Sequence, residues 1–439
     1  MLNGNFLWVL LKIITKITYK ISTMNQIITI DIRKAVIALS DALDLVGVDE
    51  VQHGKRVAYI AVQCARRLGL DEESCNELFE IGLIHDIGVS ETSVHKHLIE
   101  EFEWDDENYH CQVGFELIKD YPPLAEYAQP ILHHHTPWEK LKHIRLSSRH
   151  KRFANIIHLA DKVNTLASPY YGRNILEKSD YICSEIAVNR ECHFNPSITQ
   201  AFLDIAQSPA FWIAMEGRYL YSFIADRALV EKQMHVSLED IQFLAKIFAT
   251  IVDAKSKFTS EHSINVAALA YFIAETYGLS KAVCIKLEIA GLLHDLGKLR
   301  IPDEILEKDG ELSDQERAII NQHSFETYEI LRKIPGLEDI AEWAGYHHER
   351  LNRTGYPFRP HAENISIEAR IIAIADIFQA LAQKRPYRKS LSPLQIADIL
   401  QEMVAQGEID EMVVDIVHEN LDECYAIAIV GQTEDLLKV

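Results

Sequence analysis

The sequence predicts an all-α protein made of two tandem helical domains. From about Ile27 onward, apolar residues recur at spacings of three and four, and alternating runs of the kind that form strands are few. The chain of 439 residues is too long for one ordinary hydrophobic core, and its second half repeats the motif order of the first. We therefore expect an N-terminal extension over 1–24, a first domain over 25–236 and a second domain over 237–439.

The helical spacing is clearest in six segments of the first half. They cover residues 31–45, 58–68, 75–87, 113–119, 152–166 and 199–205. The pattern breaks over 233–238 and restarts at Ser237 and Asp240, which have the spacing of a capping box at a helix start. An apolar face begins directly after these residues, so we place the boundary between the domains there.

The first 23 residues differ from the rest of the chain. Residues 6–11 are apolar, but Lys12, Lys16 and Lys20 follow them, and a membrane-spanning helix needs about 20 apolar residues. A signal peptide would carry its charges first and a small-residue cleavage site last, and neither is present. We expect no transmembrane segment. An interfacial amphipathic helix stays open, and a disordered extension or a stretch upstream of a natural start at Met24 is favoured.

Charge and cysteine content limit the partners and the compartment. The formal net charge of −21 repels nucleic-acid backbones, and no stretch looks like a basic arm, so a nucleic-acid polymer is not an expected partner. The seven cysteines are scattered and form no Cys-x-x-Cys pair, which argues against a disulfide framework and against a zinc ribbon. A reducing cytoplasm fits this pattern best, so we predict a cytoplasmic protein.

The duplication shows in the spacing of the polar motifs. In each half a histidine is followed 32 residues later by a His-Asp pair, and the two halves are offset by 209 residues at that point. The offset grows to 215 towards the end of the copies, as expected for a divergent duplication with a few inserted residues. The first copy contributes His53, His85, Asp86, His110, the histidine run 133–135 and Asp161.

The second copy carries a set of nitrogen and oxygen donors without a thiolate. These are His262, His294, Asp295, His323, His347, His348 and Asp376. Taken alone, His294-Asp295 in its apolar run could equally be a hydrogen-bonded core pair. The whole set suits iron, manganese, nickel, magnesium or zinc, and it does not suit a structural zinc knot. Two divalent ions that share Asp295 as a bridge would use all seven donors, and such a pair activates water for in-line attack on phosphorus.

Lys298 is the candidate proton donor. It lies one helical turn beyond His294, so we expect its ammonium on the same face, pointing into the pocket that the metals define. A lysine there can neutralise a phosphate or protonate the leaving alkoxide. The first copy has Val89 at this position, so we predict a silent first domain that serves dimerisation, support of the cleft or binding of a regulatory ligand. Its ligand-type residues mean that a metal could still bind there.

The ordered histidine and aspartate motifs, together with the stretch 347–357, resemble the HD-GYP family of the HD-domain phosphohydrolases. The resemblance covers about residues 237–439 and includes His-His-Glu-Arg at 347–350 and Gly-Tyr-Pro at 355–357. It implies an all-helical HD fold in both copies and a centre of two or three metals. It also implies hydrolysis of a cyclic dinucleotide, cyclic di-GMP or 3',3'-cyclic GMP-AMP, to a linear dinucleotide. By position it implies that the seven donors above are the ligands and that Lys298 lies near the scissile phosphate.

Two departures from the family pattern affect the expected site. Phe258 stands where trinuclear members have a glutamate, so we expect two metals, of which iron, manganese, nickel and magnesium are the candidates. Arg353 stands where the family loop usually has glycine, which adds a cation beside the Gly-Tyr-Pro motif. A local positive set in an acidic chain suits a small dianionic ligand. The predicted substrate-binding residues are Arg350, Arg353, Gly355, Tyr356, Pro357, Arg385, Arg388 and Lys389.

Two other functions stay open at this point. The chain could be a sensor that binds a cyclic dinucleotide without cutting it, although a sensor has no need of Lys298. It could also be a general nucleotide phosphohydrolase of the HD superfamily, which the Gly-Tyr-Pro motif disfavours. The sequence does not distinguish cyclic di-GMP from cyclic GMP-AMP, and it leaves a homodimer possible.

Overall fold

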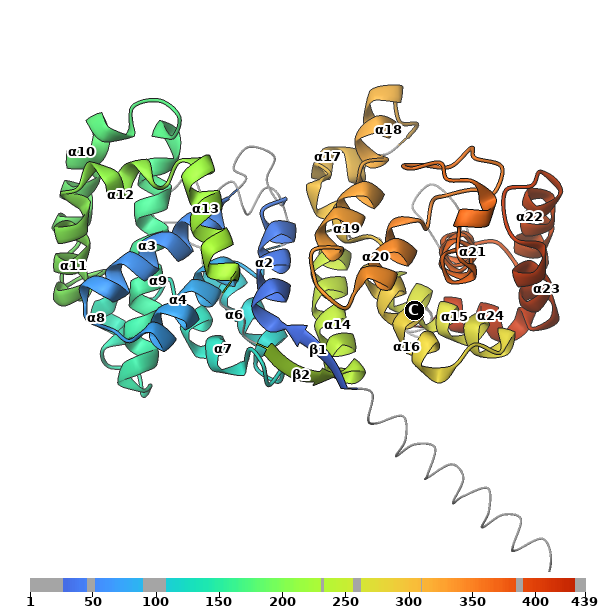
Figure 1. Cartoon of the computed structure of the whole chain (residues 1–439), viewed down its shortest axis with the longest axis horizontal. Helices are drawn as coiled ribbons and strands as arrows, with labels where there is room; N and C mark the ends of the chain where they lie inside the picture. The colour runs from blue at the N-terminus through green and yellow to red at the C-terminus, as the bar shows by residue number, and fades with distance from the viewer. Residues whose placement is uncertain are drawn as a thin grey trace, which may run out of the picture.

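The computed structural model describes residues 27–45, 52–89, 108–229, 233–255, 262–308, 310–383 and 390–430, and it forms two helical lobes (Figure 1). The prediction of an all-α fold with two tandem domains is confirmed. Within these ranges, none of the helices combines the length and the hydropathy needed to cross a membrane. The predicted extension 1–24, Phe258, Arg385, Arg388 and Lys389 lie outside the described residues.

The first lobe contains the six helices predicted from the spacing, with ends that differ by a few residues. Its elements are α2 (Ile32–Leu43), α3 (His53–Arg67), α4 (Glu72–Ile84), α6 (Asn108–Ile118), α7 (Ala125–Leu132), α8 (Trp138–Leu141), α9 (Ser148–Ala167), η1 (Ser168–Tyr170), α10 (Ile175–Val188), α11 (Pro196–Ala206), α12 (Pro209–Ile213) and α13 (Gly217–Ala228). Helix α3 begins at His53, five residues before the predicted start. That histidine therefore lies at a helix N-terminus.

The second lobe repeats this plan. Its elements are α14 (Leu238–Ala254), α15 (His262–Tyr277), α16 (Lys281–Leu293), η2 (Leu296–Arg300), α17 (Asp303–Leu306), α18 (Asp314–Ile320), α19 (His323–Leu331), α20 (Glu338–Gly345), η3 (Ala362–Asn364), α21 (Ile367–Ala382), α22 (Pro393–Ala405), α23 (Glu411–Glu419) and α24 (Leu421–Ala428). The predicted capping box is present at the start of α14, where Ser237 Oγ accepts from Asp240 N at 3.1 Å and Asp240 Oδ2 accepts from Ser237 N at 2.9 Å.

A short antiparallel ribbon joins the two copies, and the sequence pattern did not predict it. Strand β1 (Ile27–Asp31) pairs with β2 (Gln233–Ser237), with Ile27 opposite Ser237 and Asp31 opposite Gln233. The expectation of helix from Ile27 onward is therefore wrong for these first residues. Their partner lies some 200 residues away in sequence, and local periodicity carries no information about so distant a pairing.

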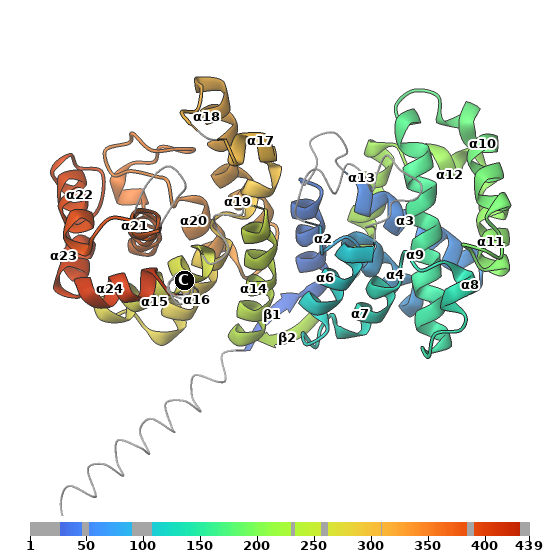
Figure 2. The ribbon, with the colours of Figure 1, turned by 180° about the vertical axis from the view of Figure 1, so that it is seen from behind.

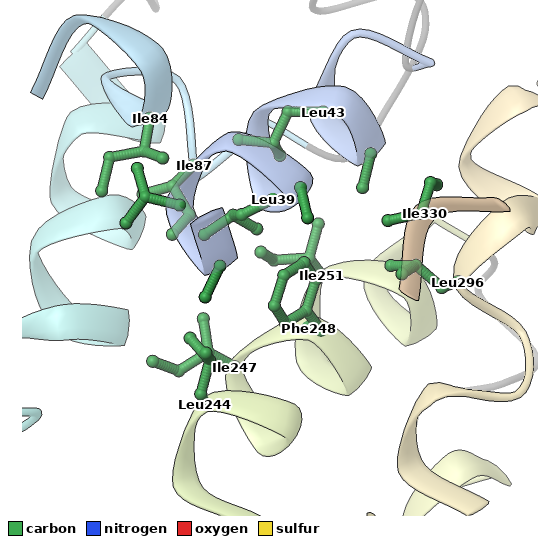
Figure 3. Close-up of a cluster of buried hydrophobic side chains, with 14 of the residues drawn as sticks. Leu39, Leu43, Ile84, Ile87, Leu244, Ile247, Phe248, Ile251, Leu296 and Ile330 are labelled. Atoms are coloured by element: carbon green, nitrogen blue, oxygen red, sulfur yellow. The ribbon is translucent and has the colours of Figure 1, made fainter. Parts of the chain in front are cut away.

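The junction between the lobes is apolar, and in it α2 faces α14, η2 and α19 (Figures 1 and 2). Figure 3 shows Leu39 of α2 against Phe248 of α14, with Leu296 of η2 at one side and Ile87 at the other. All four side chains are buried. Since Ile87 directly follows Asp86 and Leu296 directly follows Asp295, this junction lies behind the His-Asp motif of both copies.

Candidate metal centre

The structure brings all seven predicted donors of the second domain together, most of them from helix ends. His262 begins α15, His294 and Asp295 directly follow α16, His323 begins α19, His347 and His348 lie just beyond α20, and Asp376 lies within α21. The donor atoms form three overlapping groups that are compact enough to hold metal ions. The His-Asp pair is therefore part of a polar cluster and not an isolated core pair.

Asp295 lies between two groups of histidines. Its Oδ2 is 3.3 Å from His262 Nε2 and 3.2 Å from His294 Nε2. Its Oδ1 is 3.5 Å from His323 Nε2 and 3.9 Å from His347 Nε2. Each carboxylate oxygen faces its own group, which is the arrangement of a bridging ligand between two ions.

Asp376 faces the same two groups from α21. Its Oδ1 is 3.3 Å from His262 Nε2 and 3.7 Å from His294 Nε2. Its Oδ2 is 3.9 Å from Nδ1 of His348. The second carboxylate therefore contributes one oxygen to each group of histidines.

Backbone carbonyl oxygens fix the histidine tautomers. The Nδ1 atoms of His294, His323 and His347 lie 2.7, 2.6 and 2.6 Å from the carbonyl oxygens three residues before them. A carbonyl oxygen only accepts, so Nδ1 carries the proton and Nε2 presents its lone pair to the centre. Gln379 Oε1, 2.5 Å from Nδ1 of His262, has the same effect. Gln379 was missed at the sequence level, although it lies three residues after Asp376 on the same helix.

The donor set fits metal ions. Nε2 of His323 and Nε2 of His347 lie 3.1 Å apart with both lone pairs facing inward, an arrangement that a cation between them would stabilise. Asp295 is 3% exposed, and its Oδ1 accepts no hydrogen bond from the described residues. A buried carboxylate oxygen without a donor costs about 1–3 kcal/mol or more, which a bound cation would remove. Nitrogen and oxygen donors without sulfur suit a catalytic pair of ions.

Burial and neighbouring charges set the ionisation that ligation needs for three histidines and for Asp295, whereas, against the effect of its burial, hydrogen bonds with Asp295 and Asp376 raise the pKa of His262 to about 9. Burial lowers the pKa of His323 to about 4 and holds the pKa of His347 and His348 well below the usual value. Although burial opposes it, nearby His294 and Lys298 hold the pKa of Asp295 well below its usual value. The three histidines are thus neutral and the carboxylate ionised at neutral pH, as ligands must be.

Lys298 reaches the centre by a different route from the one predicted. Helix α16 ends at Leu293, and Lys298 lies on the 3₁₀ turn η2, not on a continuing α-helix. Its Nζ donates to Asp295 Oδ2 at 2.5 Å, and its side chain is 22% exposed. The ammonium therefore lies beside the bridging carboxylate and can be reached from solvent.

Gly297 allows η2 to pack against α19. A Cβ at this position would lie 2.0 Å from the carbonyl oxygen of His323, so no other residue fits without moving the helix. The Gly297 N–H donates to Thr327 Oγ1 at 2.9 Å, and this hydroxyl donates to the His294 carbonyl at 3.1 Å. The glycine and the threonine thus hold η2 against the start of α19, next to the centre.

The Gly-Tyr-Pro segment folds back onto the histidine pair. The Tyr356 ring lies 4.8 Å from the His348 ring, and Tyr356 N donates to the His348 carbonyl at 3.2 Å. Gly355, the first residue of the segment, is buried, and Pro357 follows Tyr356 through a cis bond. Glu349 fixes the end of the segment, because its Oε1 accepts from the backbone N–H of Phe358, the residue after Pro357, at 2.6 Å. The segment therefore covers one side of the centre with the Tyr356 ring.

Comparisons with known proteins agree with this architecture. Models described as the HD domain match residues 51–166 and 246–413. The chain is 38% identical over 407 residues to the 3'3'-cGAMP-specific phosphodiesterase 1 of Vibrio cholerae, covering 91% of this chain and 94% of that protein. The chain belongs to the HD-GYP family. It has the tandem form of this family, with a degenerate first HD domain.

Two further proteins resemble the chain in sequence or in fold. A cyclic di-GMP phosphodiesterase of Thermotoga maritima is 36% identical over 185 residues, which cover 41% of this chain and 50% of that protein. The crystal structure of the cyclic GMP-AMP-specific phosphodiesterase V-cGAP3 of V. cholerae superposes with a TM-score of 0.62 at 24% identity, covering 90% of this chain and 98% of that one. The latter likeness supports the two-lobed fold.

Two of the predicted basic contacts of this HD-GYP domain, Arg350 and Arg353, lie within the described residues, beside the Gly-Tyr-Pro segment. Arg350 donates from Nη1 to the Glu349 carbonyl at 3.0 Å, and its Nε lies 3.9 Å from a Glu408 oxygen. Arg353 is exposed and donates from Nε to the Arg359 carbonyl at 3.3 Å. Neither is shown bonded to the donor set among the described residues. Their contact with substrate stays a prediction. Arg359, which the sequence analysis did not single out, holds the segment by donating to the Gly355 carbonyl at 3.0 Å.

Proposed function

We propose that this chain is a metal-dependent phosphodiesterase that hydrolyses a cyclic dinucleotide to a linear dinucleotide, with its active site at the donor set of the second domain. The observation that carries the proposal is the place of Lys298, whose ammonium lies 2.5 Å from the carboxylate oxygen that faces His262 and His294. A sensor would need no such donor beside its metal ligands. Membership of the HD-GYP family and the names of the relatives support the same reaction.

The favoured substrate is 3',3'-cyclic GMP-AMP. The relative that matches 91% of the chain is named for that dinucleotide, whereas the Thermotoga relative named for cyclic di-GMP matches 41%. The long match includes the first domain and both sides of the junction. We therefore expect faster turnover of 3',3'-cyclic GMP-AMP than of cyclic di-GMP.

The seven donors would hold two divalent ions, with iron, manganese, nickel and magnesium as candidates. When bound, such a pair supplies an activated water and holds the non-bridging phosphate oxygens. The chain's own contribution is to fix the ring tautomers through Gln379 and the backbone carbonyls, and to keep the carboxylate of Asp295 between the two histidine groups.

We infer that two side chains act on the phosphate directly. Lys298 Nζ carries three N–H groups, of which one is directed at Asp295, so others can donate to a phosphate oxygen or to the departing ribose oxygen. Burial raises the pKa of Tyr356, so its hydroxyl stays protonated and can donate as well. Both side chains are partly exposed, as groups that contact a substrate need to be.

The test is a product assay on the purified full chain, loaded with each candidate metal in turn. Linear dinucleotide should form from 3',3'-cyclic GMP-AMP, more slowly from cyclic di-GMP, and not after metal removal by a chelator. Binding of the dinucleotides by the metal-loaded protein without any linear product would overturn the proposal in favour of a sensor. A cytoplasmic location and a homodimer stay predictions.

A further inference from the structure

The first domain gathers a second set of seven donors, outside the site described above. They are His53, His85, Asp86, His110, His134, His135 and Asp161. Asp86 lies between two histidine groups, with Oδ2 3.3 Å from His53 Nε2 and Oδ1 3.2 Å from His110 Nε2. The corresponding distances from Asp295 are 3.3 and 3.5 Å. The bridging geometry is therefore present in both domains.

The rings of the first domain are also held in place from behind. The Nδ1 atoms of His85 and His134 lie 2.9 and 2.6 Å from the carbonyl oxygens three residues before them, so their Nε2 lone pairs face inward. Asn164, three residues after Asp161 as Gln379 is after Asp376, donates from Nδ2 to Nδ1 of His53 at 2.8 Å, whereas Gln379 presents its oxygen to His262. The contacts behind His85 and His134 have therefore been kept, and the one behind His53 has changed from an acceptor to a donor.

One residue changes the chemistry of this set. Cys111 directly follows His110, where the second domain has Ser324 after His323. The buried Cys111 Sγ lies 3.7 Å from His110 Nε2 and 3.9 Å from His134 Nε2. Zinc holds sulfur at about 2.3 Å and nitrogen at about 2.0–2.1 Å, so two such ligands of one tetrahedral ion lie roughly 3.5 Å apart. The thiol is close to that spacing from His110 Nε2, but it lies nearer to Nδ1 of His134, at 3.6 Å, than to its Nε2. The Cys111 side chain would therefore have to turn for both residues to bind one ion, while the rings stay in place.

The features that would act on a phosphate in the second domain are replaced by packing in the first. Val89, buried, stands at the place of Lys298. In place of the Gly-Tyr-Pro segment, Trp138 N donates to the His193 carbonyl at 3.0 Å, and the His158 ring lies 6.0 Å from the His135 ring. A small cavity borders His53, His85 and Asp86 beside Val89, whereas Cys111 and the three histidines around it are all buried. The half of the set that contains the thiol therefore suits a closed metal site better than a phosphate site.

We propose that the first domain holds a metal centre of its own, in which Cys111 supplies a thiolate beside His110, His134 and His135. A thiolate with imidazoles in a closed site favours zinc, whereas the second domain offers only nitrogen and oxygen. The protein then carries two chemically different centres, and the sulfur-containing one does not take part in hydrolysis. This proposal is independent of the substrate of the second domain.

The experiment uses cobalt as a probe, because a cobalt–thiolate bond gives a near-ultraviolet charge-transfer band that nitrogen and oxygen ligands do not give. The metal-free full chain is titrated with Co(II), and so are the Asp295→Ala, Cys111→Ser and Cys284→Ser variants. Cys284 is a matched control, since it is buried in the second domain with its Sγ 3.6 Å from the Leu279 carbonyl. Serine at position 111 reproduces the residue that the second domain has there.

The band should form in the native chain, in Asp295→Ala and in Cys284→Ser, and it should be lost in Cys111→Ser. A native chain without the band, or a Cys111→Ser variant that keeps it, would overturn the proposal. If Cys111→Ser does not fold, X-ray absorption spectroscopy of the zinc-loaded Asp295→Ala variant tests instead whether zinc is bound by sulfur. A sulfur neighbour at about 2.3 Å supports the thiolate centre, and a shell of only nitrogen and oxygen refutes it.

Discussion

The ammonium of Lys298 lies 2.5 Å from Asp295 Oδ2, the same oxygen that faces His262 and His294. The lysine, three residues away on a 3₁₀ turn, is therefore positioned by the Asp295 carboxylate, which we propose as the bridge between the two ions. Any change that moves Asp295 should also move the proposed proton donor.

Replacing Lys298 by alanine should lower kcat by about 10²–10⁴-fold, because general acid catalysis of this kind contributes a factor of that order. Metal content should stay unchanged, since Lys298 is not among the donors. The measurement is turnover of 3',3'-cyclic GMP-AMP together with elemental analysis. Lys286→Ala is the control, because Lys286 lies in the same domain but pairs with the exposed Asp339 at 3.0 Å. Unchanged turnover in Lys298→Ala would remove this residue from the mechanism.

The two bridging aspartates should differ in their effect on turnover. Asp295→Ala should lose the second-domain metal and activity together, because it removes the carboxylate that faces both histidine groups. Asp86→Ala should lose only first-domain metal and keep most of the turnover. Metal analysis and product assay on both variants give the comparison. A folded Asp86→Ala protein without turnover would show that the first domain is not silent.

Gln379→Ala should weaken metal binding by about 10–100-fold, since partners that orient a ligating histidine typically have effects of this size. Gln379 is buried and its Oε1 lies 2.5 Å from Nδ1 of His262. Competition with a metal-sensitive dye measures the affinity. Gln401→Ala on the exposed side of α22 is the control. An affinity equal to that of the native chain would mean that the ring does not need this support.

Gly297→Ala should lower both thermal stability and metal occupancy. Its methyl group would lie 2.0 Å from the His323 carbonyl oxygen, and relieving such an overlap in a packed region typically costs about 1–3 kcal/mol. Thermal unfolding and metal analysis check the two effects. Gly217→Ala serves as the control, because its methyl group would meet only the Gln52 side chain, at 3.3 Å. Equal unfolding temperatures for the two variants would contradict the packing argument.

The junction between the lobes should depend on apolar packing more than on its ion pair. Lys333 Nζ and Asp41 Oδ2 lie 2.9 Å apart across the junction, but the lysine side chain is 53% exposed, so a double-mutant cycle should give at most about 1 kcal/mol. Leu39→Ala, which empties a buried position in Figure 3, should cost about 2–5 kcal/mol. Denaturant unfolding measures both free energies. A coupling energy between Lys333 and Asp41 that is larger than the loss of stability in Leu39→Ala would contradict this order.

Most of the helices and the whole donor set could be predicted because both leave local marks in the sequence. Apolar spacing marks a helix, and histidine and aspartate in a repeated order mark the site. Three features left no such mark. The β1–β2 pairing joins distant segments, the 3₁₀ turn under Lys298 results from the contact of Gly297 with His323, and Gln379 becomes a supporting residue only through its approach to His262.

The Gly-Tyr-Pro segment is a second place where the sequence predicted a role but not the contacts of the side chains. The motif predicted a substrate-binding role for Tyr356, and the structure places its ring against His348. The arginines beside it point to neighbouring backbone carbonyls, and a charge count along the sequence cannot reveal such local partners. Cys111 was read only as one scattered cysteine, because its approach to His134 depends on the packing of α6 beside α7.

The pairing of β1 with β2 has a consequence for how the protein can be divided. A fragment that starts at residue 237 would lack β1 and all of β2 except Ser237, and the apolar side of α14 that Figure 3 shows against α2 would face water. Exposed apolar surface of this kind favours association with other chains. The second domain contains the whole proposed active site, but it is not an independent folding unit. Its fusion to another protein would require a helix that covers α14 in place of α2.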